Sequence, residues 1–369
     1  MMTANSASAN SALVNPENVA SPGHPGQPGY SEHPEHSGRP DGVPLLAVRD
    51  LTVRYRSESG PVTAVAGLSF DVAAGETLGI VGESGSGKSA ASMAIMGLLP
   101  AGTEVTGSVK LNGRELLTLS DTQMRDVRGR RIAIVFQDAL SALNPMMTVG
   151  AQLAEAMAVH HRDRDRAELR ERAAELLDLV GIPDPRARLD QYPHEYSGGM
   201  RQRVLIAMGI ANDPEILITD EPTTALDVTV QAQVLEVIER VQDRTDTAVV
   251  LITHDLGVVA GLADRVLVLY AGTNLEEGPV DELFHATAHP YTEGLLAALP
   301  RVDRKVARLV PIPGQPPSPH ARPVGCPFGP RCEHFVSEVC DVPRLPVTRV
   351  SPEHASACAR VLEIMGAAR

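Results

Sequence analysis

The sequence predicts an α/β protein built on a mainly parallel sheet. Short apolar runs typical of buried strands alternate with helical stretches, and a glycine-rich loop joins one such run to a helix. Hydrophobic residues make up 43% of the 369 residues and charged residues 21%, an ordinary globular balance. A chain of this length has room for about two to three domains.

The first 43 residues are rich in serine, asparagine, proline, glycine and histidine. Such a composition cannot bury enough apolar surface to offset the entropy of ordering, so we expect a disordered N-terminal tail over residues 1–43. The tail has neither the basic region nor the apolar stretch of a signal peptide, and no segment approaches the roughly 18 to 20 apolar residues of a membrane span. We therefore expect a cytosolic protein.

Ordered structure is expected from residue 44 to about residue 300. The strands predicted by apolar patterning are LLAVRDLTVRY (45–55), VTAVAGLSFDV (62–72), ETLGIVG (76–82), IAIVFQ (132–137), EILITDEP (215–222), AVVLITHD (248–255) and RVLVLYAG (265–272). The predicted helices are a segment after Ser89 that turns Met93, Ile95, Met96 and Leu99 toward a core, then AQLAEAMAVHH (151–161), RAELRERAAELLDLVG (166–181), RQRVLIAMGIAN (201–212) and VQAQVLEVIERVQD (230–243). The polar helices between about 150 and 195 interrupt the alternation, so we expect a helical subdomain at about 138–196.

The amino-acid composition changes after HPYTEGLLAALP (289–300), where the chain becomes rich in proline. We place a small appended module at about 301–369. It contains every cysteine of the chain, with five, seven and seventeen residues between successive members: Cys326, Cys332, Cys340 and Cys358. These spacings match neither the usual zinc pairs nor the ferredoxin runs, but clustered thiols in a reducing compartment favour a metal or free thiols over disulfides.

The glycine-rich loop, GESGSGKS, fits the pattern G-x-x-x-x-G-K-[ST] between a strand and a helix. Glycines let successive backbone N–H groups point at one cluster of oxygens, and the helix start adds unpaired donors. Lys88, one of only three lysines in the chain, would reach the terminal phosphates, and Ser89 would bind Mg²⁺. The loop residues expected to bind a nucleotide are Gly82, Ser84, Gly85, Ser86, Gly87, Lys88 and Ser89.

Two further segments suit phosphate chemistry. Asp220 ends a predicted buried strand and suits the Mg²⁺ shell, while Glu221 suits a base that polarises the attacking water. Ser197, Gly198 and Gly199 precede a helix and form a second anion site, which one nucleotide bound to one chain hardly needs.

With these parts in this order, the chain resembles the ATP-binding-cassette (ABC) ATPases. YSGGMRQR (196–203) resembles their signature segment, usually LSGGQ, although Tyr196 and Met200 depart from it. The resemblance implies a P-loop fold with a RecA-like core, an antiparallel β subdomain and a helical subdomain. It also implies that Gln137 is the Q-loop glutamine and a Mg²⁺ ligand, that Asp227 belongs to the D-loop, that His254 contacts the γ-phosphate and that Tyr55 stacks on adenine. The signature would close on ATP held by a second ABC ATPase subunit.

The segments around Gln137 and the signature, together with HPYTEGLLAALP and CPFGPRC, resemble the ATPases of oligopeptide and dipeptide importers. This resemblance implies peptide import with ATP and Mg²⁺, two membrane permeases, an extracytoplasmic solute-binding protein, and a peripheral position at the cytoplasmic face of the membrane. It also implies a [4Fe–4S] cluster on the four cysteines. Zinc, helped by His334 or His354, and free or paired thiols are the alternatives.

Three other functions share part of this pattern. An importer of nickel or another small solute would carry the same motifs, and so would a soluble ABC ATPase of DNA repair or translation. An iron–sulfur redox or sensor protein is the third. The net charge of −13 and the scarcity of aromatic residues, 3%, exclude bulk binding of nucleic acid.

Overall fold

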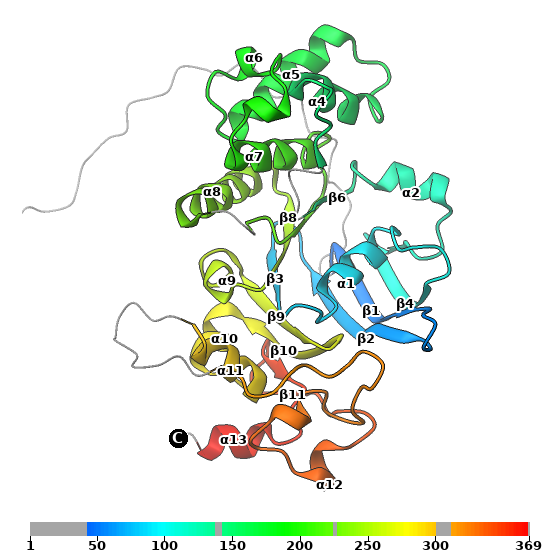
Figure 1. The fold of residues 1–369 in the computed structure, drawn as a ribbon, viewed down its shortest axis with the longest axis vertical. Coiled ribbons are helices and arrows are strands. Elements are labelled where there is room, and N and C mark those ends of the chain that lie inside the picture. Colours follow the sequence, from blue (N-terminus) through cyan, green and yellow to red (C-terminus); the bar gives the residue numbers. More distant parts are fainter. Residues whose placement is uncertain (1–42, 137–141, 224–226, 300–310, 368–369) are drawn as a thin grey trace, which may run out of the picture. The chain divides into compact units, whose positions relative to one another are not determined.

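The computed structural model describes residues 43–136, 142–223, 227–299 and 311–367, which group into one compact unit (Figure 1). Within the described residues, the main sheet is mixed and has the strand order β11-β12-β10-β9-β3-β8-β7-β6. The pairs from β9 through β6 are parallel, and those from β9 through β11 are antiparallel. The strands are β3 (Thr77–Val81), β6 (Ile132–Val135), β7 (Ile216–Asp220), β8 (Ala248–Thr253), β9 (Arg265–Tyr270), β10 (Thr273–Pro279), β11 (Thr348–Arg349) and β12 (Ala355–Ser356).

Four adjacent strands of this sheet, β9, β3, β8 and β7, are buried on both faces. Every residue of β3, β7 and β8 is buried, and only the first residue of β9 is partly exposed. The continuous apolar runs of the sequence follow from this arrangement, because a parallel strand covered on both sides does not alternate between polar and apolar residues. The α/β prediction with a mainly parallel core is confirmed.

A second, antiparallel sheet covers one side of the main sheet through a shared apolar core. Its strands lie in the order β2-β1-β4-β5, with bounds β1 (Leu46–Tyr55), β2 (Val62–Val72), β4 (Glu104–Leu111) and β5 (Arg114–Glu115). The first two strands were predicted from their patterning. The last two and helix α2 (Asp121–Val127) were not, since few of their residues are buried.

Helix α1 (Lys88–Ile95) is shorter than the sequence suggested. Leu99, which this helix was expected to carry toward the core, lies beyond the helix end but does pack against that core. The chain leaves the helix at Gly97, whose φ of 62° lies in the left-handed region, and Pro100 prevents a return to helical geometry.

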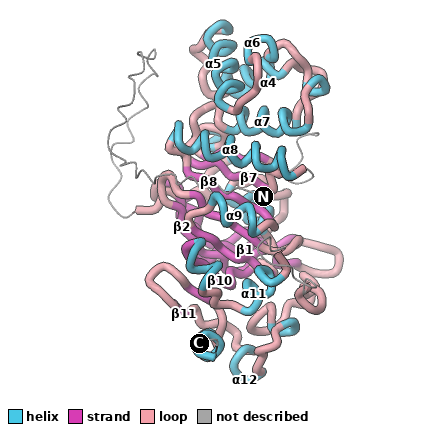
Figure 2. Tube along the Cα trace, turned by 90° about the vertical axis from the view of Figure 1, so that its left-hand side faces the viewer, coloured by secondary structure: helices cyan, strands magenta, loops and turns pink. Residues whose placement is uncertain are grey.

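Between β6 and β7, the described residues form mainly helices. These are α4 (Val149–Ala158), α5 (Arg166–Leu179), α6 (Pro185–Arg188), the 3-10 turn η1 (Pro193–Glu195) and α7 (Gly198–Gly209). These helices lie together above α8 (Val228–Thr245), which covers the main sheet (Figure 2). Asp165 is the N-cap of helix α5, and its carboxylate accepts the N–H groups of Ala167 and Glu168 in a capping box, so the local sequence determines where the helix starts.

The C-terminal part adds α9 (Leu256–Leu262), α10 (Val280–His285), α11 (Pro290–Ala297), the 3-10 turn η2 (Gly329–Arg331), α12 (Ser337–Cys340) and α13 (Val361–Ala367). Its last strands join the main sheet, because β12 pairs with β10 at Glu276↔Ser356 and Glu277↔Ala355. Within the described residues, no helix combines the length and the apolar character that a membrane span requires.

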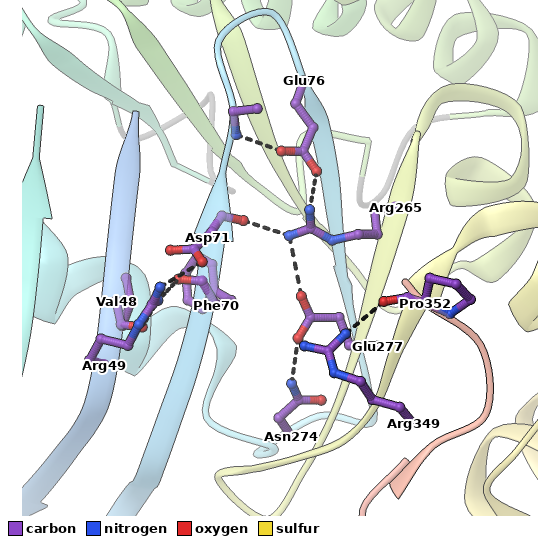
Figure 3. A network of polar contacts seen from close by, with 11 residues as sticks. Val48, Arg49, Phe70, Asp71, Glu76, Arg265, Asn274, Glu277, Arg349 and Pro352 are labelled. Carbon is purple, nitrogen blue, oxygen red and sulfur yellow. Dashed lines mark hydrogen bonds and ion pairs between the residues drawn. The ribbon is translucent and has the colours of Figure 1, made fainter. Parts of the chain in front are cut away.

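One guanidinium connects the two sheets on the side of β10. Arg265 pairs with Glu76 at 2.9 Å and Glu277 at 3.2 Å, and donates to the carbonyl oxygen of Asp71 on β2 at 2.6 Å (Figure 3). Burial raises the pKa of Glu277, and the charge of Arg265 opposes that shift. Breaking such a pair would leave carboxylates unpaired inside the fold, so this contact fixes how the antiparallel sheet meets the main sheet.

Candidate functional site

Several of the predicted site residues meet at the carboxyl edge of the main sheet. The GESGSGKS loop follows β3, Asp220 ends β7 and His254 follows β8. Because β3, β8 and β7 are adjacent and parallel, with Val81 opposite Thr253 and Asp220 opposite Ile252, their carboxyl ends lie side by side. This edge is where open α/β sheets bind their ligands.

The buried ammonium group of Lys88 is folded onto its own loop. Its Nζ donates to the carbonyl oxygens of Gly82 at 2.7 Å and Glu83 at 3.2 Å. Burial lowers the pKa of Lys88, and the charges of Glu221 and Asp220 oppose that shift. A cation removed from water in this way interacts strongly with an anion that enters the loop.

The rest of the loop is shaped by close backbone packing. Gly87, with φ of 102°, precedes α1, and a Cβ atom there would lie 2.4 Å from the carbonyl oxygen of Ala64. The carbonyl oxygen of Ser86 accepts the N–H of Gly272 at 2.7 Å. The Ser86 hydroxyl is buried without a partner among the described residues, whereas Ser84 and Gly85 are exposed. The loop is therefore rigid on its protein side and open on the other, as a phosphate site must be.

The predicted Mg²⁺ ligands Ser89 and Asp220 are in contact with each other. Burial raises the pKa of Asp220, and a hydrogen bond from the Ser89 side chain opposes that shift. Asp220 is 7% exposed. A hydroxyl and a buried carboxylate side by side are the oxygen ligands that Mg²⁺ takes beside a nucleotide. The third predicted ligand, Gln137, lies outside the described residues.

The side chains of Glu221 and His254 contact each other at this edge of the sheet. Nδ1 of His254 lies 3.3 Å from Oε1 of Glu221, and the two side chains are 58% and 17% exposed, respectively. Glu221 has φ of 49°, a left-handed conformation that is costly for this residue type, and its N–H is fixed by the carbonyl oxygen of Ile252 at 2.8 Å. The backbone thus holds the carboxylate out of the strand direction and next to the histidine.

The predicted second anion site lies elsewhere in the chain, at the start of α7 among the helices in the upper part of Figure 1. Ser197 caps this helix by accepting the N–H of Met200 at 3.3 Å, and Ser197 and Gly198 are exposed. Gly199 has a packing reason in addition, because a Cβ atom there would lie 2.4 Å from Val230 on α8. Within the described residues, no hydrogen bond or ion pair joins the signature segment to the phosphate loop of the same chain.

The two departures from the signature consensus face the protein interior. Tyr196 is 3% exposed, and its hydroxyl donates to the carbonyl oxygen of Arg188 at 2.9 Å. Burial raises the pKa of Tyr196 to about 12. Met200 packs against the same core. Both substitutions therefore alter packing and leave the exposed serine and glycine unchanged.

Two predicted residues occupy positions with local structural roles. Asp227 caps α8 by accepting the N–H groups of Thr229 and Val230 at 3.1 and 3.0 Å. Tyr55 ends β1, half-buried against the apolar core, and burial raises its pKa. Their predicted contacts with a nucleotide stay predictions.

All four cysteines are unpaired and line one cavity with His334 and His289. Burial raises the pKa of Cys326 to about 11 and also raises that of Cys332 and Cys358. His354 is not part of this cavity: its Nε2 lies 2.8 Å from Oε1 of the buried Glu276. Its expected help for zinc is therefore wrong, because the ring is held by a carboxylate on β10.

Within the described ranges, no three His, Cys, Asp or Glu side chains are arranged to hold a metal ion. That result supports neither metal expected on the cysteines, so the zinc site and the [4Fe–4S] cluster both stay predictions. The four thiols that line the cavity equal in number the ligands that such a cluster takes.

Three residues around the phosphate loop were not predicted. Glu83 lies within the loop motif at a variable position, and its contacts are with Tyr291 and Arg331 from the C-terminal part. Tyr291 stands in the quoted segment HPYTEGLLAALP and Arg331 in CPFGPRC. Both segments were singled out only for their resemblance to the peptide-importer ATPases. The signal that the sequence offered for Arg331 is its position next to Cys332.

The comparisons agree with this geometry. Residues 65–224 match the ABC transporter family, and residues 275–340 match the C-terminal region of oligopeptide/dipeptide transporters. The oligopeptide transport ATP-binding protein OppD of Mycobacterium tuberculosis is 53% identical over 88% of this chain and 53% of its own length. The dipeptide transport ATP-binding protein DppD of Bacillus subtilis is 52% identical over 80% of this chain and 89% of its own length.

The chain thus spans about half the length of the mycobacterial relatives it matches, 53%, but most of the length of the Bacillus subtilis protein. A solved dimeric ATP-binding cassette in a post-hydrolysis state, bound to ADP and phosphate, is 26% identical with a TM-score of 0.58. It covers 64% of this chain and 99% of its own. The fold, the site at the carboxyl edge and these matches agree, and the chain belongs to the ABC transporter family, in the branch with an oligopeptide/dipeptide transporter C-terminal region.

Proposed function

We propose that this protein is an ATP-hydrolysing subunit that powers the import of di- or oligopeptides through partner membrane permeases. The observation that carries the proposal is the meeting of a lysine-bearing phosphate loop, two adjacent carboxylates and a histidine at one sheet edge. The match of residues 275–340 to the C-terminal region of oligopeptide/dipeptide transporters supports peptides as the cargo.

The proposed division of labour follows from the contacts at that edge. The loop amides and Lys88 bind the phosphates of ATP, which they can do because the ammonium is already beside the loop. Ser89 and Asp220 hold Mg²⁺ together with Gln137, and the ion supplies positive charge to the phosphates. Glu221 accepts a proton from the attacking water, and His254 contacts the γ-phosphate.

A second subunit completes the site in this proposal. Ser197 and Gly198 are exposed at the start of α7, a 12-residue helix whose first N–H groups have no partner within the helix. These donors and Asp227 would meet ATP bound to another ABC ATPase chain, either a copy or a homologue. Closure and reopening of the pair would drive the permeases between their two access states.

The partners would dock on the helical segment between about 138 and 196. Met146 is 82% exposed and Val159 60% exposed on this segment, which suits contact with an apolar partner surface. Two permeases, an extracytoplasmic solute-binding protein and a peripheral position at the cytoplasmic face of the membrane complete the proposed system. Nucleic acid has no place in it.

Transport by a reconstituted complex tests this function. We expect the chain, purified with its permeases and second ATPase in liposomes, to accumulate a labelled tripeptide only when ATP and the solute-binding protein are present. Uptake of Ni²⁺ without peptide would instead identify a small-solute importer. ATP hydrolysis that never responds to the permeases would place the chain among soluble ABC ATPases.

We further propose that Cys326, Cys332, Cys340 and Cys358 hold a [4Fe–4S] cluster. The support is the shared cavity and the chemistry of four thiols. The surrounding module has little apolar core of its own, with Ala288, Cys358 and Val361 forming its small cluster. A bound cluster would supply part of the folding free energy that this core lacks.

Iron content checks the cluster. We expect anaerobically purified protein to be brown with about four iron atoms per chain. Cys340→Ser should lose most of this iron and lower the melting temperature, because one ligand is gone. Val339→Ser, a matched change at the exposed neighbour, should keep both. Colourless protein with stoichiometric zinc, or with four free thiols and no metal, would contradict the cluster.

A further inference from the structure

Two residues of the C-terminal part, Tyr291 and Arg331, bond to Glu83 in the phosphate loop. Glu83, the second residue of GESGSGKS, is fixed at three of its groups. Its N–H donates to the hydroxyl of Tyr291 at 3.0 Å, and its carbonyl oxygen accepts from Lys88. Its carboxylate receives both ends of the Arg331 guanidinium, Nη1 at 2.7 Å and Nη2 at 3.1 Å. The bidentate pair joins residues 248 positions apart in the chain.

Arg331 is itself tightly positioned. It is 8% exposed, and its Nε donates to the carbonyl oxygen of Pro313 at 2.8 Å. Nη1 also lies 3.2 Å from the hydroxyl of Tyr270, and the guanidinium carbon lies 5.7 Å and 5.8 Å from the ring centres of Tyr270 and Phe328. A guanidinium fixed on so many sides presents one orientation to Glu83 and loses little further entropy in doing so.

The charge of Glu83 makes this contact matter for an anion. A carboxylate within a loop that receives phosphates repels them, and the repulsion is strong where water is excluded. Arg331 neutralises that carboxylate and holds it against the C-terminal part. Lys88, the loop's own lysine, bonds to the carbonyl oxygen of the same residue. The orientation of Glu83 therefore affects both the potential in the loop and the position of its cation.

We propose that Arg331 is a positioning residue for the nucleotide site: by pairing with Glu83 it holds the phosphate loop in its binding conformation and cancels a charge that would repel ATP. The proposal rests on the proposed function, in which this loop binds MgATP. Arg331 directly precedes Cys332 at the end of η2, so the order of the cysteine cavity and the order of the phosphate loop are linked through one side chain.

The test measures MgATP binding by the full-length chain with isothermal titration calorimetry, alongside its basal hydrolysis. We expect Arg331→Gln to raise the dissociation constant about tenfold, because Glu83 is left ionised and unpaired beside the phosphates. KM for MgATP should rise by the same factor, while kcat stays within about twofold, since Arg331 touches no reacting atom.

A double variant separates charge from packing. Adding Glu83→Gln to Arg331→Gln removes the unpaired charge, so the dissociation constant should return to within about threefold of the parent's. Arg331→Lys keeps the positive charge but cannot make two parallel hydrogen bonds to Glu83. Its dissociation constant should therefore lie between those of the parent and Arg331→Gln. Arg349→Gln is the matched control: this exposed arginine of the same C-terminal part donates to the carbonyl oxygen of Pro352 (Figure 3) and should leave binding unchanged.

A folded Arg331→Gln protein with the parent's dissociation constant overturns the proposal, even if its melting temperature falls. A double variant that binds no better than Arg331→Gln overturns the charge argument. If Arg331→Gln does not fold, Arg331→Lys decides alone, and an unchanged dissociation constant there has the same meaning. Lys88→Ala separates a failure of the Arg331 proposal from a failure of the proposed function. If Lys88→Ala also binds MgATP normally, the proposed function of the loop has failed and not only the role of Arg331.

Discussion

Lys88→Ala is expected to reduce MgATP hydrolysis by this chain at least about 100-fold. The side chain is 5% exposed and reaches the loop carbonyl oxygens of Gly82 and Glu83, so its charge is already desolvated where phosphates would bind. Alanine removes this cation and leaves the carboxylates of Asp220 and Glu221 without it. Release of phosphate from ATP by the purified chain, together with transport by the complex, measures the loss.

A second lysine provides the control for that experiment. Lys110 lies exposed on β4, in the antiparallel sheet, and Lys110→Ala should retain the parent's rate. Circular dichroism should show that both variants are folded. Hydrolysis and transport at undiminished rates in Lys88→Ala would reject the assignment of the loop.

Glu221→Gln is expected to bind MgATP and to hydrolyse it about 100- to 10,000-fold more slowly. The amide keeps the shape of the side chain and the left-handed backbone at φ of 49°, but it cannot accept the proton of the attacking water. The partner at 3.3 Å, Nδ1 of His254, remains in place. Single-turnover hydrolysis of labelled ATP isolates the chemical step from nucleotide binding.

The same variant should collect in a closed, ATP-bound pair of ATPase subunits. Size-exclusion chromatography in the presence of MgATP would detect this pair, which we expect the parent to form only transiently because it should hydrolyse its ATP. Glu239→Gln, an exposed glutamate of α8, is the control and should behave as the parent does. If Glu221→Gln turned over ATP at the parent's rate, the catalytic carboxylate would lie elsewhere.

The parts of the site that the sequence predicted are local. A strand, a glycine-rich turn and a helix start are each encoded within a few residues. The sequence alone therefore placed the loop before Lys88 between a strand (β3) and a helix (α1). Buried parallel strands were visible as unbroken apolar runs. The carboxylates at the end of β7 could be assigned because the ends of parallel strands share an edge.

The parts that the sequence did not predict depend on long-range packing. Gly199 was read as a phosphate contact, but its contact with Val230 needs the relative position of α7 and α8. Asp227 was assigned from a motif, whereas its role as the N-cap of α8 depends on where that helix begins in the folded chain. The pair of Glu83 and Arg331 joins two segments whose closeness exists only in the folded chain.

The pairing of β12 with β10 has a consequence for how this protein tolerates shortening. Strand β10 gains a neighbour on its outer side through Glu276 and Glu277, and the N–H of Ala357 adds a bond to the carbonyl oxygen of Leu275 at 2.8 Å. A chain that ended before residue 348 would expose that side as an open edge with unpaired backbone donors and acceptors. Open edges of this kind pair with other chains, so the C-terminal strands guard the sheet against aggregation.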